Sequence, residues 1–232
     1  MKRTRYSHER VAGCYEALAR IYSRGRIGAA KASQIEEMRA GDRVLYAGVG
    51  GGEDALLAAR RGVRLSAVDL SPAMLRALRR RLDGEGLAGE LIVGDVLEHR
   101  AEEPYDLVAA NFFLNVFAEE VMLRVLAHLA SQVRPGGKLL VADFAPPGQG
   151  STSVCTSART PARTSAWVHA LYYRPVNLAA WALRLCALHP IYDYVPAAAR
   201  LGLSLRRRRR FRLGRSGPEL YESLVFERPA LP

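Results

Sequence analysis

Short apolar runs alternate with helix-like segments along the first two thirds of the chain. Five runs are rich in aliphatic and β-branched residues and too short for typical helices, which predicts buried strands. These runs cover residues 43–49, 64–70, 89–95, 105–113 and 137–144. The intervening segments repeat apolar residues at every third or fourth position, which predicts amphipathic helices over 53–61, 71–82 and 118–133.

This order of elements predicts a doubly wound α/β fold. Strands that are apolar throughout are buried on both faces, so the alternation indicates a parallel sheet covered by helices on both sides. The stretch RPGGK at 134–138 predicts a helix stop and a tight turn. Further along, 177–188 and 195–203 predict helices, and 203–213 and 220–228 predict a closing strand pair. We therefore expect a mainly parallel seven-stranded sheet, an N-terminal helical segment, and a helical lid inserted before the last two strands.

Length and composition narrow the class of protein. At 232 residues, 49% of them hydrophobic, the chain can bury one large core. No apolar run approaches the roughly 18 residues of a membrane span, and the basic residues 1–10 lack the apolar core of a secretory signal. We therefore expect a cytoplasmic protein. Cys14, Cys155 and Cys186 are far apart and odd in number, so neither a disulfide framework nor a metal site is expected.

The net charge of +11 comes almost entirely from arginine, since Lys2, Lys31 and Lys138 are the only lysines among 34 basic residues. The densest block, Arg206–Arg210, falls within a predicted strand. We interpret this block as a solvated or salt-bridged strand. The alternatives are contact with phosphates or with an anionic membrane surface. No obligate nucleic-acid partner is expected.

Three alternating glycines, Gly48, Gly50 and Gly52, interrupt the chain between the first predicted strand and its helix. This turn belongs at the carboxyl end of the strand, where open α/β sheets bind their ligands. Glycine permits positive φ and has no Cβ, so a ligand can lie against the backbone. The next two residues, Glu53 and Asp54, would repel a pyrophosphate but favour a ligand that carries an ammonium or sulfonium group.

Carboxylates end the next two predicted strands. Asp69 follows the glycines by about twenty residues, where an acid can accept both hydroxyls of a ribose. Asp95 ends the third strand, where it can accept a hydrogen bond from an adenine amino group. Because glycines and acids stand in this order at successive strand ends, they point together to a nucleoside-containing ligand.

At these residues the sequence resembles the class I S-adenosylmethionine-dependent methyltransferases. The resemblance runs from about Val44 to Pro147 and is closest to the ubiquinone/menaquinone biosynthesis branch, through the stretches 11–22 and 111–147. It implies S-adenosylmethionine as the cofactor. The cofactor-binding residues that it implies are Tyr46, Gly48, Gly50, Gly52, Asp69, Leu70, Met74, Asp95, Val96 and Asn111.

Tyr46 departs from the family pattern, which usually has an acid two residues before the first glycine to balance the methionine ammonium. A phenol can accept one hydrogen bond but is uncharged near neutral pH. Recognition of the ammonium would then be left to backbone carbonyls, to water, or to Glu53 or Asp54. Two interpretations follow: an active enzyme with a rearranged ammonium contact, or a divergent protein that only binds the cofactor or uses it for other chemistry.

The substrate side is expected to come from two aromatic-rich segments, which divide the chain into four parts. These parts are an N-terminal helical cap at 1–40, the cofactor-binding core at 41–150, a lid at 151–198, and the last helix with the closing strands at 199–232. Substrate-binding candidates are Tyr22, Phe112, Asn115, Tyr172, Tyr173, Trp181 and Tyr192. Catalytic candidates are His169, His189 and Tyr15, each of which could instead be structural.

The expected activity is in-line methyl transfer from S-adenosylmethionine to O, C or N of a small aromatic or apolar molecule. An RNA or protein methyltransferase is the alternative within the enzyme class, and a cofactor-binding protein without methyl transfer is the alternative outside it. The charge favours a polymer substrate, whereas the stretch NFFL at 111–114 lacks the Asn/Asp-Pro-Pro-Tyr/Phe motif of such enzymes. Contact with a membrane surface and formation of a homodimer are left open by the sequence.

Overall fold

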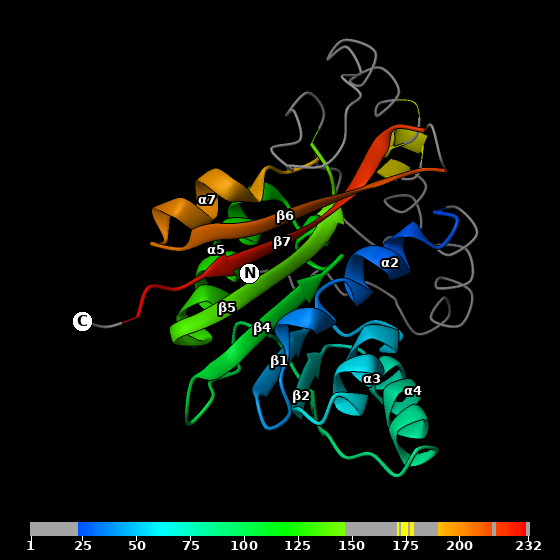
Figure 1. Cartoon of the computed structure of the whole chain (residues 1–232), viewed down its shortest axis with the longest axis vertical. Coiled ribbons are helices and arrows are strands. Elements are labelled where there is room, and N and C mark those ends of the chain that lie inside the picture. The colour runs from blue at the N-terminus through cyan, green and yellow to red at the C-terminus, as the bar shows by residue number, and fades with distance from the viewer. Residues whose placement is uncertain are drawn as a thin grey trace.

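Seven strands form one sheet in the order β3-β2-β1-β4-β5-β7-β6 (Figure 1). The structure is a computed structural model that describes residues 23–146, 171, 173–175, 177–178, 190–214 and 217–230. The strands are β1 (Arg43–Ala47), β2 (Arg64–Asp69), β3 (Glu90–Val93), β4 (Tyr105–Asn111), β5 (Val133–Phe144), β6 (Ser204–Arg212) and β7 (Glu219–Glu227). Strands β1 to β5 pair in parallel, and β7 runs antiparallel to both β5 and β6. The predicted fold class is confirmed.

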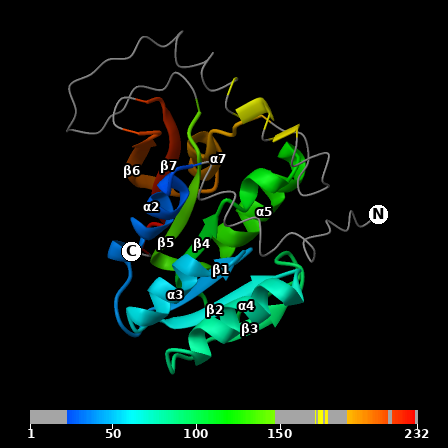
Figure 2. The same ribbon diagram turned by 90° about the vertical axis from the view of Figure 1, so that its right-hand side faces the viewer.

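Helices cover both faces of the sheet, as the apolar strands require (Figure 2). The α-helices are α2 (Arg26–Ala32), α3 (Glu53–Arg60), α4 (Pro72–Asp83), α5 (Glu119–Gln132) and α7 (Tyr194–Arg200), with 3-10 turns η1 (Ile35–Glu37) and η2 (Leu114–Val116). One core joins α5 and α7 to the sheet through Val141, and the other joins α3 and α4 through Leu140. Neighbouring residues of β5 thus enter opposite cores, because side chains alternate along a strand.

A helix ends just before the RPGGK stretch, as predicted, but the stretch does not form the predicted separate turn. Helix α5 ends at Gln132 and β5 begins at the next residue, so 134–137 form the irregular start of the strand and not a separate turn. A register shift between Tyr105 and Leu107 accommodates these extra residues. Gly136 has a φ of 71°, and its amide donates to the carbonyl of Arg228. Strand pairing with the chain end therefore overrides the local turn signal.

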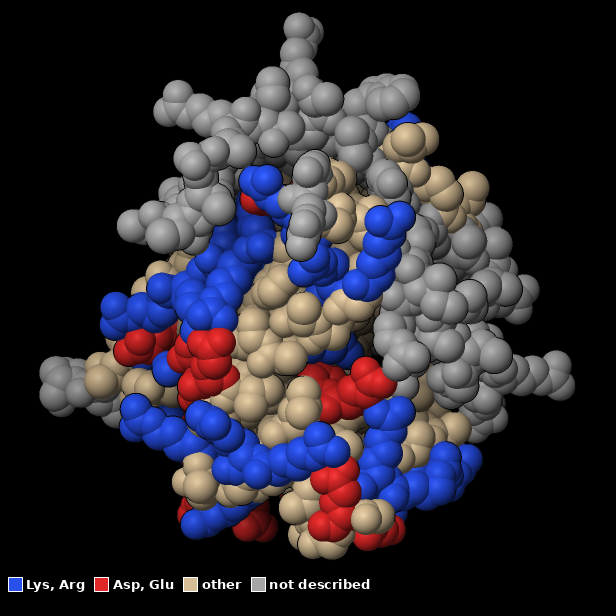
Figure 3. All heavy atoms as spheres, turned by 45° about the vertical axis from the view of Figure 1, so that its right-hand side comes forward, with Lys and Arg blue, Asp and Glu red and all other residues tan. Residues whose placement is uncertain are grey.

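The arginine block of β6 lies in a network of ion pairs with acidic side chains. Its partners are Glu227 for Arg206, Glu36 and Glu37 for Arg207, Asp193 and Glu222 for Arg208, Glu36 for Arg209, and Glu219 and Glu222 for Arg210. Figure 3 shows basic and acidic side chains next to one another on this side of the molecule. The salt-bridged interpretation is confirmed. An edge strand of this kind also resists pairing with other chains.

Several predicted elements fall outside the described residues. The N-terminal helix of 11–22 and most of the predicted lid helix at 177–188 are among them, as are the candidates Tyr15, Tyr22, His169, Tyr172, Trp181 and His189. Within the part of the chain that the structure describes, no helix is long and apolar enough to cross a membrane.

Candidate functional site

The glycine turn joins β1 to α3 at the carboxyl edge of the sheet. Gly48, Gly50 and Gly52 have φ angles of 66°, 55° and 75°, a region that other residues rarely adopt. The amide of Gly48 donates to the carbonyl of Val68, and that of Gly52 donates to the carbonyl of Val49. The backbone itself thus requires glycine at all three positions.

The surroundings of the three glycines differ. No atom lies within 4 Å of the place where a Cβ would stand on Gly50, so its backbone faces open space. A Cβ on Gly48 would overlap the ring of Phe113, and one on Gly52 would lie 2.9 Å from Cδ1 of Leu78. This corrects the expectation that all three glycines present bare backbone to a ligand. Gly50 does so, while Gly48 and Gly52 make room for the protein's own side chains.

Asp69 connects the glycine turn to the start of α4. Its Oδ2 accepts a hydrogen bond from the amide of Gly50 at 3.3 Å, and its Oδ1 accepts from the amide of Ser71 at 2.8 Å. The Ser71 side chain in turn caps α4 by accepting from the amide of Met74. The next residue, Leu70, leaves 59% of its surface exposed beside this carboxylate. An exposed leucine at a strand end offers an apolar surface that a flat base could cover.

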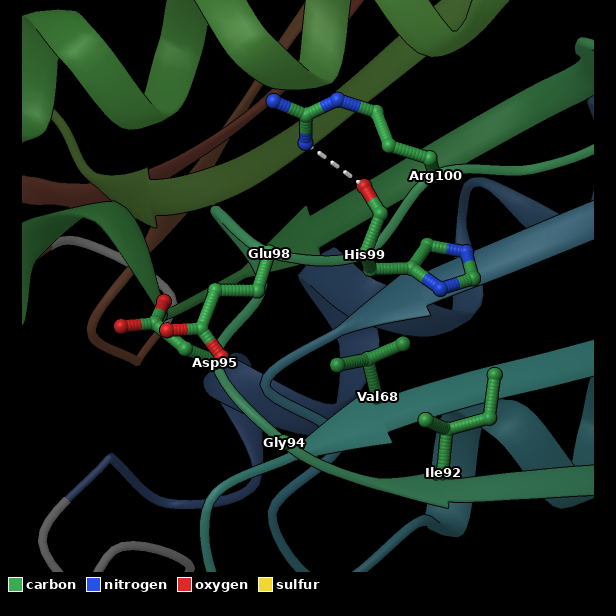
Figure 4. A pocket seen from close by; sticks show the side chains of 7 residues that line it. All are labelled: Val68, Ile92, Gly94, Asp95, Glu98, His99 and Arg100. Atoms are coloured by element: carbon green, nitrogen blue, oxygen red, sulfur yellow. Dashed lines mark hydrogen bonds between the residues drawn. The ribbon is translucent and has the colours of Figure 1, made fainter.

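A cavity of about 260 Å³ lies beyond the ends of β2 and β3, next to Asp95 (Figure 4). It is lined by Val68, Ile92, Gly94, Asp95, Glu98, His99 and Arg100. Figure 4 shows apolar side chains projecting from the two strands, with the polar residues along the following loop. The Oδ1 of Asp95 accepts from the amide of Leu97 at 3.0 Å, which fixes the loop. Partial burial lowers the pKa of His99, and its Nε2 lies 3.0 Å from the Tyr105 hydroxyl.

Tyr46 lies in the core, not at the ligand edge. Its side chain is 2% exposed, and its hydroxyl donates to the backbone carbonyl of Asp54 at 3.1 Å. Burial raises its pKa well above the ordinary value, so the phenol stays neutral. The expectation that Tyr46 contacts the cofactor therefore changes: it fixes the start of α3 against β1. Met74 and Val96 are likewise buried in the two cores.

Asn111 and the start of α3 are joined by a buried hydrogen bond. The Nδ2 of Asn111 donates to Oδ2 of Asp54 at 2.9 Å, and its Oδ1 accepts from the amide of Ala142 at 3.0 Å. Asn111 ends β4, which pairs directly with β1. Asn111 thus lies at the end of β4 with its side-chain amide engaged by the protein, and its contact with the cofactor stays a prediction.

Four aromatic rings gather at the ends of β4 and β5. Phe112 packs against Phe144 and Tyr221 with centroid distances of 5.8 and 6.0 Å, and Phe144 lies 4.9 Å from Tyr173. Phe112 has a φ of 51°, an unusual conformation for a bulky residue. Sequence reasoning named Phe112 and Tyr173 but missed the other two. The pairing of Phe144 with Tyr221 across β5 and β7 places them together, and only the strand register reveals it.

On the opposite face of β5, Asn115 and Tyr192 serve the protein's own structure. Asn115 donates to Oδ1 of Asp143 at 2.8 Å, and Tyr194 donates to its Oδ2 at 2.5 Å. The Tyr192 hydroxyl donates to the carbonyl of Phe117 at 2.9 Å. Burial raises the pKa of Asp143 to about 7. Asp143 and Tyr194 were not among the sequence candidates, because a polar residue inside an apolar strand gives no signal of its partners.

The described residues fit S-adenosylmethionine. Gly50 offers bare backbone, Leu70 offers an exposed apolar side chain, and Asp95 lines a cavity at the neighbouring strand end. Among these described residues, no group of three or more metal-binding side chains comes together. The parallel sheet with this turn defines the class I methyltransferase fold.

Comparison with known proteins agrees with this fold. A family described as a methyltransferase domain matches residues 44–137. A demethylmenaquinone methyltransferase of Thermus thermophilus is 29% identical over 146 residues, covering 61% of this chain and 66% of the relative. A protein-L-isoaspartate O-methyltransferase of Methylorubrum extorquens is 33% identical over 113 residues, covering 48% and 46%. The chain thus spans about half to two thirds of these relatives' lengths.

Among solved structures, the 1,6-didemethyltoxoflavin-N1-methyltransferase of Burkholderia thailandensis aligns with a TM-score of 0.61 at 18% identity. The alignment covers 88% of this chain and 78% of that one. That structure holds S-adenosylhomocysteine. The match of residues 44–137 to a methyltransferase domain, together with the shared fold, supports a class I S-adenosylmethionine-dependent methyltransferase that uses S-adenosylmethionine as its cofactor.

Proposed function

We propose that this chain transfers a methyl group from S-adenosylmethionine to a small aromatic or apolar acceptor. The observation that carries this proposal is the cluster of Phe112, Phe144, Tyr173 and Tyr221, defined above and here called the aromatic cluster. It lies at the ends of β4 and β5, and Phe113, the neighbour of Phe112, packs on Gly48 of the cofactor turn. Aromatic rings at this edge favour a flat, weakly polar acceptor.

The roles of the cofactor-side residues follow from their positions. When bound, S-adenosylmethionine supplies an electrophilic methyl group on a sulfonium. Asp69 would hold the ribose hydroxyls, Asp95 the adenine amino group, and the Gly50 backbone would lie against the nucleoside. In-line methyl transfer requires mainly alignment of nucleophile, methyl and leaving group, so positioning can supply much of the rate. Phe112 and Phe144, the partly exposed members of the aromatic cluster, would orient the acceptor, and the buried Tyr173 and Tyr221 would support them.

The names of similar proteins support a small acceptor. The similar structure from Burkholderia thailandensis is that of a 1,6-didemethyltoxoflavin-N1-methyltransferase with bound 1,6-didemethyltoxoflavin, and the Thermus relative is named a demethylmenaquinone methyltransferase. The isoaspartate relative is named for a protein substrate, which keeps a polymer acceptor as the second candidate. The arginine block, which would have served such a polymer, is instead ion-paired within the fold.

The test is methyl transfer from isotopically labelled S-adenosylmethionine to a panel of phenols, quinols and heteroaromatic amines, read by mass spectrometry. We expect turnover on at least one member. Phe144→Leu should lower kcat/KM for that acceptor about tenfold while S-adenosylhomocysteine affinity stays unchanged. Label that appears only in added protein or RNA, or in no acceptor while the cofactor binds, would contradict the proposal.

A further inference from the structure

A buried carboxylate beside the glycine turn has no role in the site as described so far. Glu53 and Asp54 are consecutive acids at the start of α3, and their side chains differ in solvent exposure. The Glu53 side chain is 54% exposed and lies 3.8 Å from Arg81, whereas Asp54 is 3% exposed. Only Asp54 therefore points into the protein at this turn.

Three further elements converge on Asp54. Its Oδ2 accepts a hydrogen bond from Asn111 at the end of β4, and its Oδ1 lies 3.5 Å from the Nζ of Lys31 on α2. Its backbone carbonyl accepts from Tyr46 of β1. The carboxylate of Asp54 is thus held by β4 and α2, and its backbone is held by β1. All of these contacts lie at the edge of the sheet that carries the glycines.

The ion pair of Asp54 is weak for its degree of burial. Burying a carboxylate is costly unless it is fully paired, and strong charged hydrogen bonds span about 2.7–2.9 Å. The distance of 3.5 Å between Asp54 Oδ1 and Lys31 Nζ is much longer. A carboxylate has about four lone-pair positions, so Oδ1 retains the capacity to accept a stronger donor.

We propose that Asp54 binds the α-ammonium group of the methionine end of S-adenosylmethionine. Asn111 orients the carboxylate through Oδ2, and the cofactor ammonium takes Oδ1 in place of Lys31. The inference rests on the cofactor assignment and adds the residue that recognises its positive end. The other buried acids of the described residues, Asp143 and Glu222, belong to β5 and β7 and have partners there.

The chemistry of the turn supports this assignment. Tyr46 stands on β1 two residues before Gly48 and is neutral and buried, so it supplies no charge to a ligand. Its hydroxyl instead holds the backbone of the residue that does carry charge. The negative charge of this site is thus supplied by the helix that follows the glycines, and the strand before them anchors it.

The experiment compares two ligands that differ in one group. Isothermal calorimetry is run with S-adenosylhomocysteine and with its analogue that lacks the α-amino group. We expect Asp54→Asn to weaken binding of S-adenosylhomocysteine about tenfold or more, while affinity for the deaminated analogue changes less than about twofold. Glu53→Gln, the matched control on the exposed neighbour, should alter neither affinity.

An equal loss for both ligands in Asp54→Asn would show a purely structural role and overturn the proposal, as would no loss for either. Lys31→Met gives a second, independent test should the first variant fold poorly. With the competing cation gone, S-adenosylhomocysteine should bind several-fold more tightly and the deaminated analogue should not. Weaker or unchanged binding of S-adenosylhomocysteine would also overturn it. Failure of the unmodified chain to bind S-adenosylhomocysteine would refute the cofactor assignment itself.

Discussion

Acidic residues differ in burial and in hydrogen-bond partners between the two ends of the sheet. At the ends of β2 and β3, Asp69 and Asp95 accept hydrogen bonds from loop amides and stay partly exposed, and Asp95 also lines a cavity. At β5, β7 and β6, Asp143 and Glu222 are buried and surrounded by protein partners. We infer that the acids at the first end meet a ligand, whereas the acids at the second end stabilise the fold.

The difference shows how to separate a binding acid from a structural one. Asp69, which we propose binds the ribose, is held by local backbone amides and lies next to the exposed side chain of Leu70. A structural carboxylate such as Glu222 lies between cations that the neighbouring strand supplies. The origin of the partners thus separates Asp69 from Glu222. Asp54 is buried and held by side chains of other elements, as Glu222 is, so the proposed role of Asp54 is decided by the binding experiment above.

The largest effect is expected at the cofactor end, from Asp69→Ala. This change removes the acceptor for the Gly50 and Ser71 amides as well as the proposed ribose contact. We expect S-adenosylhomocysteine affinity to fall about 100-fold or more, measured by calorimetry. Asp83→Ala, at an exposed acid in the last turn of α4, is the matched control and should bind normally. Undiminished affinity in Asp69→Ala would contradict the ribose assignment.

At the other end, Glu222→Ala should destabilise the fold without affecting the cofactor. It removes one of the two acidic partners of Arg208 and of Arg210 in a buried site, and breaking a buried ion pair costs about 3–5 kcal/mol in comparable cases. Chemical denaturation measures this loss. Glu227→Ala, which removes the partner of the exposed Arg206, should cost less than about 1 kcal/mol. Weakened cofactor binding in folded Glu222→Ala would mean that the two ends are coupled.

The same buried acids predict how stability depends on pH. Burial raises the pKa values of Asp143 and Glu222 to about 7, whereas carboxyl groups of unfolded chains titrate near 4. The folded state therefore retains protons that the unfolded state releases. The contribution of these two carboxyl groups to the free energy of unfolding is fully present below about pH 4 and is lost as the pH rises through about 7.

We expect the melting temperature to fall by several degrees from pH 5 to pH 8, measured by calorimetric scans. Asp143→Asn should flatten this slope, because an amide does not titrate. A slope that Asp143→Asn leaves unchanged would assign the pH dependence to other groups.

The smallest effect is expected from Tyr46→Phe. It removes one buried hydrogen bond to the carbonyl of Asp54, which costs about 1 kcal/mol of unfolding free energy. Because the phenol lies in the core, S-adenosylhomocysteine affinity should change less than about twofold. A large loss of affinity with intact stability would show that the hydroxyl contacts the ligand.

The sequence predicted the strands and the glycine turn at the end of the sheet formed by β1 to β3, because the signals for these elements are local. The alternation of strands and helices placed Asp69 and Asp95 at successive strand ends, and the glycines stand where positive φ is needed. Other features depend on strand register and could not be read from one segment. The joining of Phe144 to Tyr221, and of Asp143 to Tyr194, is of this kind. Tyr46 lies on its predicted strand, but its side chain is buried in the core that joins α3 and α4 to the sheet and does not lie at the ligand edge.

A crystal structure of the chain with S-adenosylhomocysteine tests the cofactor site most directly. The predicted result is a nucleoside along the strand ends, with its ribose hydroxyls at Asp69 and its adenine between Leu70 and Asp95. The nucleoside should also lie against the backbone of Gly50. A nucleoside bound elsewhere, or these carboxylates turned away from it, would contradict the assignment of this edge as the cofactor site.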